Sequence, residues 1–471
     1  MANSKEMGAE NPSPPSGIHP PRETLITQSQ VEAIGRELAE PGWVVDNRQQ
    51  ALKVFNGMAY PSPGDREWTR TPPSLFSLGD LELGALAYSG KRVKPPAALK
   101  HPLAAEEVGG QIVLCGKDPS DISLADDLRK TGVYIGSIGN AAKEFPDALR
   151  KWMGRVVQTE EGKYAALTSA VYETGVFIHV PKGAQITKPI YALLWMPGVN
   201  FQAWRTLIVL EEGASLTVLH ETASPSHDEK NLRAGIVEIV LDAGATLNFI
   251  EYQNWGDNVH HLTNQRAVVQ QGSTLHWATA QCGGKCAKNK TDLELAGEGA
   301  RGDWTGIGFY HSSQHVDWST MQHHKAPLTA SDLNYKVALA DSSRSIWNGM
   351  ILIEPGSSGA DGYQVNRNLM LSEKAHADSI PGLEILTDDV RCSHGVSIGE
   401  LDANEVFYLQ SRGILPEDIQ ALLVAGFFET ALERISNELI RRHIRREVEE
   451  QVRMGLTTPG TPYGPLSPDW E

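Results

Sequence analysis

The alternation of hydrophobic and polar positions changes character near Gly154. From there, short β-rich runs alternate with turns in which an acidic or polar pair precedes Gly-Ala or Gly-Ser. The turn glycines are spaced 30, 31, 28 and 27 residues apart, at Gly183, Gly213, Gly244, Gly272 and Gly299. One such unit is too short to bury its own apolar face, whereas stacked units bury a continuous core. The repeat therefore predicts a parallel β-helix over residues 154–400, with about eight coils.

An antiparallel β-sandwich is the alternative for the same region. Its strands recur every 8–12 residues or so, whereas the glycines here recur at about 30. Glycine at each turn also fits a tight corner that a Cβ atom would obstruct. The interval favours the β-helix.

Helical patterns precede the repeat. Residues 30–57 have helical spacing with a break at Pro41-Gly42, and a further helix is predicted over Asn140–Trp152. Prolines interrupt the stretch between them, so residues 29–153 are expected to form a helical and irregular N-terminal region. Residues 1–28, rich in Pro, Ser and polar groups, are expected to be a disordered tail.

Helical patterns also follow the repeat. A first helix is predicted to end at Gly413, and a second begins at Pro416, the position in a helix that proline favours. Apolar residues continue at helical spacing to Val448, with arginines between them. We expect residues 401–454 to form a C-terminal helical region and residues 455–471 to be a flexible tail.

Composition and charge narrow the classes of function. The 471 residues include 42 basic and 58 acidic side chains, a net charge of −16, and the one basic block lies in a short helix near the end. Binding to nucleic acid or to an anionic membrane is therefore disfavoured. No apolar stretch approaches the ~18 residues of a membrane span, and the N-terminus lacks a secretory signal pattern. We expect a cytoplasmic protein.

Cysteine is scarce, which excludes a disulfide scaffold in a chain of this length. The four cysteines are Cys115, Cys282, Cys286 and Cys392. Cys282 and Cys286 flank a glycine turn, where they either bind metal or are two ordinary thiols at a coil corner.

Histidine clusters in sequence at His311, His315, His323 and His324. The cluster lacks the helical H-E-x-x-H pattern of zinc proteases. A metal site and a set of polar positions on a solvated sheet face are both consistent with it.

A phosphate loop is only faintly matched, by Gly283-Gly284-Lys285-Cys286. Thr279 stands where the first glycine is needed, and Cys286 replaces the Ser or Thr that follows the lysine. We expect no nucleotide in this chain.

Cys392 and His394 form the most suggestive pair. Side chains two residues apart on a strand point to the same face, so a thiolate and an imidazole would project together. Such a pair suits iron, zinc or sulfur chemistry. The alternative is a buried cysteine and a hydrogen-bonded histidine at a strand end, and neighbours on one strand rarely have nucleophile–base geometry.

Several long strings of the chain are specific enough to indicate a family. They are LADSSRSIWN (Leu339–Asn348), NRNLMLS (Asn366–Ser372), PGLEILTDDVRCSHGVSIG (Pro381–Gly399), FYLQSRGI (Phe407–Ile414) and, near the N-terminus, Pro41-Gly42-Trp43 and EWTRT (Glu67–Thr71). With these strings the chain resembles the SufB/SufD family of iron–sulfur cluster assembly proteins over most of residues 40–453. The Cys-Ser-His-Gly string and the scarcity of cysteine make it most like SufD.

The resemblance implies a mainly β fold, a right-handed parallel β-helix flanked by N-terminal and C-terminal helical regions. It implies a non-catalytic scaffold subunit that pairs with SufB and binds the SufC ATPase. Clusters would be assembled at the SufB–SufD interface, and the transient cluster or iron would be shared with SufB. A homodimer is left open for the chain without SufB.

The resemblance also implies site residues. His394 matches the family histidine proposed to hold the nascent cluster or its iron, and Cys392 lies beside it. The C-terminal helical region would provide the SufC-binding surface, with Phe427 and Phe428 as candidate contacts. Alternatively, these phenylalanines pack against the end of the β-helix.

Two enzyme classes compete with the scaffold hypothesis. β-helix enzymes that act on polysaccharides place catalytic groups along one groove, and Asp303, Asp317 and Asp341 are scattered candidates for such groups. A metal-dependent hydrolase built on the histidine cluster is the other class.

Overall fold

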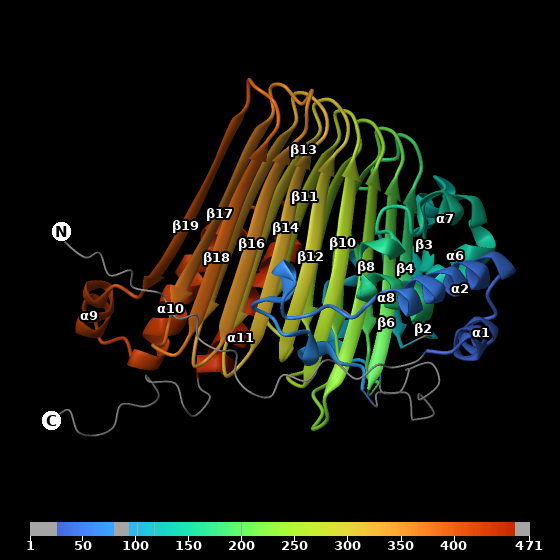
Figure 1. The fold of residues 1–471 in the computed structure, drawn as a ribbon. Coiled ribbons are helices and arrows are strands. Elements are labelled where there is room, and N and C mark those ends of the chain that lie inside the picture. Colours follow the sequence, from blue (N-terminus) through green and yellow to red (C-terminus); the bar gives the residue numbers. More distant parts are fainter. Residues whose placement is uncertain (1–25, 80–93, 101, 117, 199, 457–471) are drawn as a thin grey trace, which may run out of the picture.

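The computed structural model describes residues 26–79, 94–100, 102–116, 118–198 and 200–456 (Figure 1). Most of the two tails expected at 1–28 and 455–471 lies outside the described residues. The central body is a parallel β-helix in which sixteen strands, β4 to β19, alternate between two sheets. Each coil contains one strand of each sheet, so the sixteen strands make the eight coils that the glycine interval predicted.

The even-numbered strands form one sheet and the odd-numbered strands form the other. The strands of the β-helix are β4 (Thr174–Val180), β5 (Ile190–Trp195), β6 (Phe201–Leu210), β7 (Ser215–Ala223), β8 (Asn231–Leu241), β9 (Thr246–Asn254), β10 (Val259–Val269), β11 (Thr274–Gln281), β12 (Cys286–Leu295), β13 (Arg301–Tyr310), β14 (His315–His324), β15 (Ala330–Leu339), β16 (Arg344–Ile353), β17 (Asp361–Met370), β18 (His376–Ile385) and β19 (Arg391–Glu400). Three earlier strands, β1 (Gly110–Cys115), β2 (Asp118–Leu124) and β3 (Tyr134–Ser137), extend the two sheets. The sheets therefore begin before Gly154, in a region where only helical and irregular structure was expected.

The turn glycines of the repeat form a ladder along one edge of the β-helix. Gly183, Gly213, Gly244, Gly272 and Gly299 have φ angles between 62° and 73°, a region that strains residues with a Cβ atom. The N–H of Gly183 donates to the carbonyl of Glu212 in the next coil at 2.9 Å. In the sixth coil the equivalent position is Leu328, with φ 58°. The repeat fades in the sequence there because a side chain occupies a turn that otherwise takes glycine.

The interior of the coils, the lumen, is filled by alternate side chains of every strand. Large aromatic residues contribute much of its volume, and Trp204, Trp277, Trp304 and Trp347 are each at most 2% exposed. Trp277 and Trp304 stack in neighbouring coils with their ring centroids 5.4 Å apart. Stacking of this kind joins the coils into the continuous core that a single unit cannot form.

Helices of the N-terminal region cover the outer face of the even-numbered sheet at one end (Figure 1). The helices before β4 are α1 (Gln28–Glu37), α2 (Gly42–Gly57), η1 (Arg66–Trp68), η2 (Pro73–Phe76), α4 (Ala97–Lys100), η3 (Ala105–Glu107), α5 (Asp126–Lys130), α6 (Ile138–Glu144), α7 (Pro146–Trp152), η4 (Thr159–Glu161) and α8 (Lys163–Val171). The break at Pro41-Gly42 is confirmed. The single helix predicted over Asn140–Trp152 is wrong, because Pro146 has no N–H with which to continue α6 and instead opens α7.

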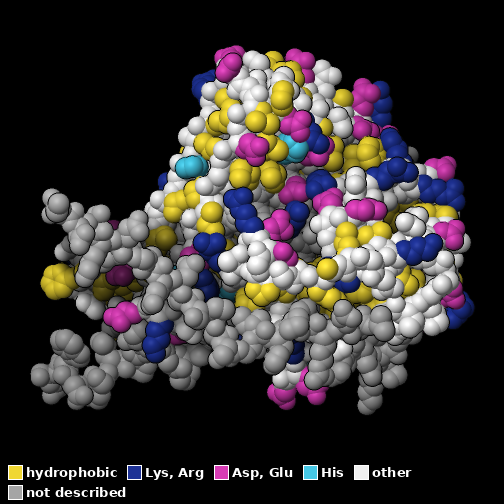
Figure 2. All heavy atoms as spheres, in the orientation of Figure 1, with side chains coloured by type: hydrophobic (Ala, Val, Ile, Leu, Met, Phe, Trp, Pro, Cys, Tyr) yellow, Lys and Arg dark blue, Asp and Glu magenta, His cyan; other side chains and the backbone are white. Residues whose placement is uncertain are grey.

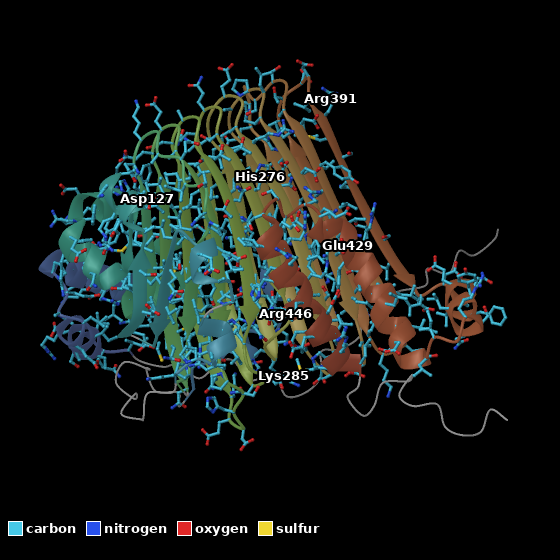
Figure 3. The ribbon with its side chains drawn as sticks, turned by 180° about the vertical axis from the view of Figure 1, so that it is seen from behind. Asp127, His276, Lys285, Arg391, Glu429 and Arg446 are labelled. Atoms are coloured by element: carbon cyan, nitrogen blue, oxygen red, sulfur yellow. The ribbon has the colours of Figure 1, made fainter. Side chains whose placement is uncertain are left out.

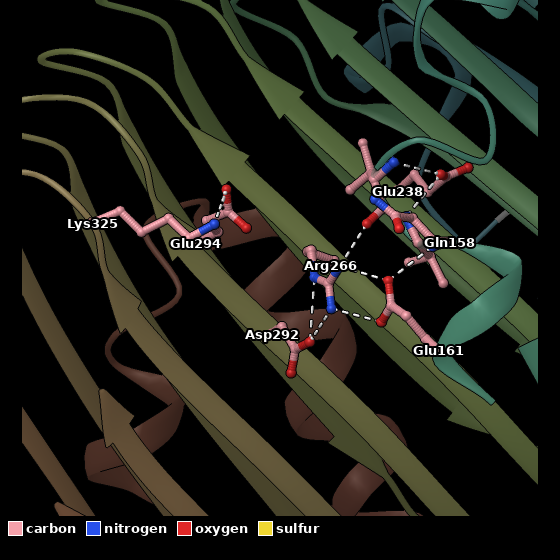
Figure 4. Close-up of polar contacts among 9 residues, drawn as sticks. Gln158, Glu161, Glu238, Arg266, Asp292, Glu294 and Lys325 are labelled. Atoms are coloured by element: carbon pink, nitrogen blue, oxygen red, sulfur yellow. Dashed lines mark hydrogen bonds and ion pairs between the residues drawn. The ribbon is translucent and has the colours of Figure 1, made fainter. Parts of the chain in front are cut away.

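Polar contacts fasten this N-terminal region to the sheet. The guanidinium of Arg266 on β10 lies 2.7 Å from Glu161 of η4 and 2.5 Å from Asp292 of β12 (Figure 4). Further along, the ammonium of Lys288 donates to the carbonyl of Glu67 at 2.7 Å. The N-terminal region is thus bound to several successive coils.

Three C-terminal helices follow the last strand: α9 (Ala403–Ser411), α10 (Pro416–Leu432) and α11 (Glu438–Leu456). Figure 3 shows α10 and α11, with Glu429 and Arg446 labelled, lying across the odd-numbered sheet. Phe428 and Ile444 are buried in the cluster that joins these helices to the outer face of that sheet. The alternative that Phe427 and Phe428 pack against the end of the β-helix is therefore wrong about the place, because the apolar side of these helices covers its flank.

Charges of both signs are interspersed over the face of the molecule shown in Figure 2, with hydrophobic side chains between them. On this face the negative net charge is therefore not gathered into one block. Among the residues that the structure describes, no helix has the length and hydropathy needed to cross a membrane.

Candidate functional site

The last coil of the β-helix has no further coil stacked on it in the described part of the chain. β18 pairs only with β16 and β19 only with β17 (Figure 1), so each has a free edge of the kind that can pair with another strand. Apolar side chains of both strands are exposed, including Val396 (42%) and Ile398 (52%). We define the end face as Leu383, Ile385, Cys392, His394, Val396 and Ile398.

Strand register places Cys392 and His394 on this face. In β17, Gly362 and Gln364 are buried while Tyr363 between them is exposed, so the even-numbered residues point into the lumen. Cys392 and His394 are the in-register partners of Gly362 and Gln364. A Cβ atom at Gly362 would lie 3.3 Å from the Sγ atom of Cys392. The thiol and the imidazole therefore project from the same side of β19, at the open end of the lumen.

Cys392 is partly exposed, whereas the other three cysteines of the chain are buried. It packs beside Ile351 and Ile353, and burial raises its pKa. The thiol is thus protonated at neutral pH and becomes a ligand when a metal displaces its proton. No group of three or more His, Cys, Asp or Glu side chains in the described chain is placed to hold a metal ion. Cys392 and the exposed His394 therefore offer at most two ligands.

A polar layer lies beneath the end face. Gln364 is fully buried, its Nε2 donates to the carbonyl of Gly382 at 3.1 Å, and its Oε1 has no partner among the described residues. The Oδ1 of Asn366 accepts from the Nδ2 of Asn368 at 2.7 Å and from the hydroxyl of Ser379. The lumen is therefore polar where it opens, unlike the aromatic stack further inside.

Cys282 and Cys286 do not converge. Cys282 packs in the cluster formed with the C-terminal helices, and Cys286 packs in the cluster formed with the N-terminal helices. Burial raises the pKa of both thiols, that of Cys282 to about 12. They are two separate buried thiols at a coil corner.

The histidines that lie close together in sequence do not converge in the structure. His324 faces the lumen, where its Nε2 lies 2.8 Å from the hydroxyl of Ser331. His323 faces outward and lies 2.7 Å from Glu354. His315 stands at the opposite end of the same strand. The arrangement gives no support to a metal-dependent hydrolase.

The scattered carboxylates line no common groove. Asp317 on β14 is buried and lies 2.9 Å from the ammonium of Lys288. Asp303 belongs to the other sheet, where its carboxylate lies 3.1 Å from His276 (Figure 3). Asp341 lies in a turn. Sugar cleavage requires two carboxyl groups about 5–10 Å apart across one groove, and these three belong to different surfaces.

The weak phosphate-loop match is a coil corner. The N–H of Gly284 donates to the carbonyl of Trp255 at 2.9 Å, and the N–H of Lys285 donates to that of Val259 at 2.7 Å. Backbone N–H groups must be free to surround a phosphate. Here they are engaged in pairing between coils.

A second surface lies on the C-terminal helices. An open groove of about 280 Å³ separates α10 from α11, and its walls include Leu422, Ala425 and Val452. α9 has no buried residues and exposes Phe407 (71%) and Tyr408 (56%). We call this surface, made of α9 and the groove, the helical surface.

The two phenylalanines proposed as partner contacts have different positions. Phe428 is 1% exposed at the base of the groove, so most of its ring packs within this chain. Phe427 is partly buried, and the ammonium of Lys336 lies 4.8 Å from its ring centroid. More of the accessible apolar area belongs to Phe407 and Tyr408.

Comparison with known proteins agrees with this geometry. A family model described as "SUF system FeS cluster assembly, SufBD core domain" matches residues 196–427, and one described as "SufBD protein N-terminal region" matches residues 121–192. The chain belongs to the SufBD family. The core match begins in the turn before β6 and includes the whole end face, so the residues of the candidate site lie within the part that defines the family.

Curated SufBD relatives match the chain almost end to end. The iron–sulfur cluster assembly protein SufB of Bacillus subtilis is 27% identical over 452 residues, covering 91% of this chain and 94% of its own length. SufBD family proteins of Staphylococcus epidermidis and Staphylococcus haemolyticus are each 26% identical with the same coverage. These relatives, like the core family model, are described as proteins of iron–sulfur cluster assembly.

Sequence patterns alone missed two parts of the site. The polar layer beneath the end face arises from Gln364, Asn366 and Asn368, and a signal for it exists in their strict alternation along one strand. The apolar residues of the end face, such as Leu383 and Ile398, resemble ordinary core positions. Only their place in the last coil makes them exposed.

Proposed function

We propose that this SufBD chain is a non-catalytic scaffold subunit that holds a nascent iron–sulfur cluster, or its iron, at the end face. The observation that carries the proposal is the open last coil, where Cys392 and His394 project among exposed apolar side chains. The cluster is cargo, held while it is built and then passed on. A thiolate and an imidazole are suitable ligands for iron.

The end face is suited to a second SufBD subunit. The free edges of β18 and β19 offer hydrogen-bonding groups to further strands, and a β-helix of the same width would continue both sheets. Burial of Leu383, Ile385, Val396 and Ile398 would stabilise the contact, since exposed apolar patches mark association sites. We propose a SufB-type subunit as this partner, with a second copy of this chain taking its place when SufB is absent.

The count of ligands supports a shared site. An iron–sulfur cluster is usually held by four cysteine thiolates, whereas the end face provides one thiol and one imidazole. The remaining ligands would come from the partner across the interface. Scarcity of accessible cysteine also supports the SufD-type role, although one curated relative has the name SufB.

The helical surface is the proposed docking site of the SufC ATPase. It combines an apolar groove with the exposed rings of Phe407 and Tyr408 on α9. α9 directly follows β19, so a movement imposed on these helices by ATP-driven closure of SufC would reach the last coil through a short connection. ATP hydrolysis would take place in the partner.

The experiment is anaerobic loading of iron and sulfide into the purified complex, comparing His394→Ala with the wild-type chain. We expect His394→Ala to lower the iron and sulfide retained while the subunits still co-purify. The control is His376→Ala, since His376 is exposed in the same coil but belongs to the alternate, outward-facing set of β18. Equal loading in all three complexes would remove His394 from the proposal.

A further inference from the structure

The lumen has a polar section in the second to fifth coils, separate from the end face in the eighth coil. A small cavity there is lined by residues of β6, β7, β9, β10, β11, β12 and β14. Six of its lining residues are Trp204, His220, Glu251, Gln253, Trp255 and His261. All of them are at least nine-tenths buried. A cluster of this polarity inside a β-helix core needs hydrogen-bond partners to be stable.

Glu251 has some of the partners it needs. Its Oε1 accepts from the Nε2 of Gln265 at 2.7 Å, and its Oε2 accepts from the indole N–H of Trp277 at 3.1 Å. Gln265 is held in turn by the hydroxyl of Thr291, which donates to its Oε1 at 2.8 Å. These donors fix the carboxyl group at one wall of the cavity.

Other lining atoms are buried without a hydrogen-bond partner among the described residues. They are the indole Nε1 atoms of Trp204 and Trp255, the Nδ1 atoms of His220 and His261, and both amide atoms of Gln253. Buried polar groups in native proteins are paired with protein atoms or with ordered water in the great majority of cases. Several unpaired groups around one cavity therefore indicate a bound molecule.

The size and chemistry of the cavity identify that molecule. The space open to the centre of a water molecule is about 20 Å³, and one water needs roughly 10–15 Å³ on this measure. The indole N–H groups only donate and the amide oxygen of Gln253 only accepts, so the occupant must both accept and donate. A bare cation or an anion meets only half of this requirement.

We propose that this cavity is an internal hydration site that holds one or two water molecules bonded to Gln253, His220 and the indole groups. Water there completes the polar section of the core and joins Glu251 to the unpaired groups around it. The site is a property of the β-helix of this chain and does not depend on the proposed function of the end face.

A crystal structure of the wild-type chain at a resolution that shows ordered water is the direct test. We expect one or two density peaks within hydrogen-bond distance of Gln253 and His220. A cavity without such peaks, or one closed by rotated side chains that bond to each other, overturns the proposal.

A matched pair of variants gives a second readout. Gln253→Met keeps the shape of the side chain and removes both unpaired atoms, so a dry cavity predicts a higher melting temperature. A hydrated cavity predicts a lower melting temperature, because bonds to water are lost. The control is Gln314→Met, whose amide is fully bonded to Cys282, Gly284 and His311. We expect Gln253→Met to lower the melting temperature by a shift comparable to that of Gln314→Met, and an unchanged or raised value overturns the proposal.

Discussion

One buried polar pair joins α11 to the sheet within the apolar contact between them. The Nε2 of His443 lies 2.5 Å from Glu221 on β7, and the two side chains are 3% and 1% exposed. Tyr191 donates to the other oxygen of Glu221 at 2.7 Å. His443→Ala therefore leaves a buried carboxylate whose one remaining side-chain donor in the described structure is a phenol.

The magnitude follows from this geometry. The guanidinium of Arg446 lies 3.0 Å from the Nδ1 of His443 and can only donate, so the imidazole bonds to Glu221 as a neutral donor. A hydrogen bond to a buried charged group is worth about 1.5–3 kcal/mol. Since Tyr191 keeps its bond, we expect a loss of about 2 kcal/mol, or roughly 30-fold in the unfolding equilibrium. Adding Glu221→Gln removes the uncompensated charge, so the double variant should be more stable than His443→Ala alone, with a coupling of about 1–3 kcal/mol.

Urea denaturation measures the loss, and hydrogen exchange along α11 shows whether the helix detaches from the sheet. Arg442→Ala on the same helix is the control. Its guanidinium is 61% exposed and lies 4.0 Å from Glu438, and such a pair contributes about 0.5 kcal/mol or less. A loss below about 1 kcal/mol for His443→Ala, with unchanged exchange in α11, would refute the reasoning.

Two further predictions concern the β-helix itself. Gly213→Ala should lower the free energy of unfolding by about 1–2 kcal/mol, because φ at this turn is 68°. The control is Gly399→Ala, where a Cβ atom has open space, and it should change the free energy of unfolding by less than about 0.5 kcal/mol. Equal losses in urea denaturation would contradict the argument that the corner glycines are needed for their positive φ. Burial raises the pKa of Glu251 to about 7. The folded chain therefore binds more protons at this carboxyl group than the unfolded chain does between about pH 4.5 and 7. As pH rises through that window, the contribution of Glu251 to the free energy of unfolding falls by about 3 kcal/mol. His220 and His261, which line the same cavity, have lowered pKa values of about 4 and 3, so their contribution to stability changes with pH in the opposite direction. The test is therefore the difference in free energy of unfolding between the wild type and Glu251→Gln, measured across this pH range. A difference that does not change with pH would contradict the raised pKa of Glu251.

The turn glycines made the fold predictable. Each left-handed corner requires a residue without strain at positive φ, so the coil period is written in the sequence from Gly183 to Gly299. Leu328 replaces the corner glycine in the sixth coil, and glycine returns in the next coil at Gly359, with φ 76°. The interval of about 30 residues therefore suffices to predict the eight coils up to residue 400.

The side on which the helices lie could not be predicted. α10 is apolar around most of its surface, so its sequence does not distinguish the face that packs on the sheet from the face that lines the groove. Phe427 and Phe428 are neighbours, yet one is partly accessible and the other buried. Their difference depends on how the helix is rotated against the odd-numbered sheet.

The polar residues of the lumen could not be recognised as buried from the sequence. Glu251 alternates with apolar residues in β9, a pattern that normally indicates a solvated face. In a β-helix the face toward the lumen is buried whatever its composition. The separation of Cys282 and Cys286 could not be predicted either. They are four residues apart across a coil corner, yet their thiols pack in different clusters.

The central claim is that the open end of the β-helix joins a second SufBD subunit around the cluster cargo. A structure of the complex that co-purifies with this chain tests it most directly. The account predicts that Val396 and Ile398, now 42% and 52% exposed, are buried against the partner, with Cys392 and His394 at the interface. A complex in which the partner binds elsewhere and these side chains stay exposed would contradict it.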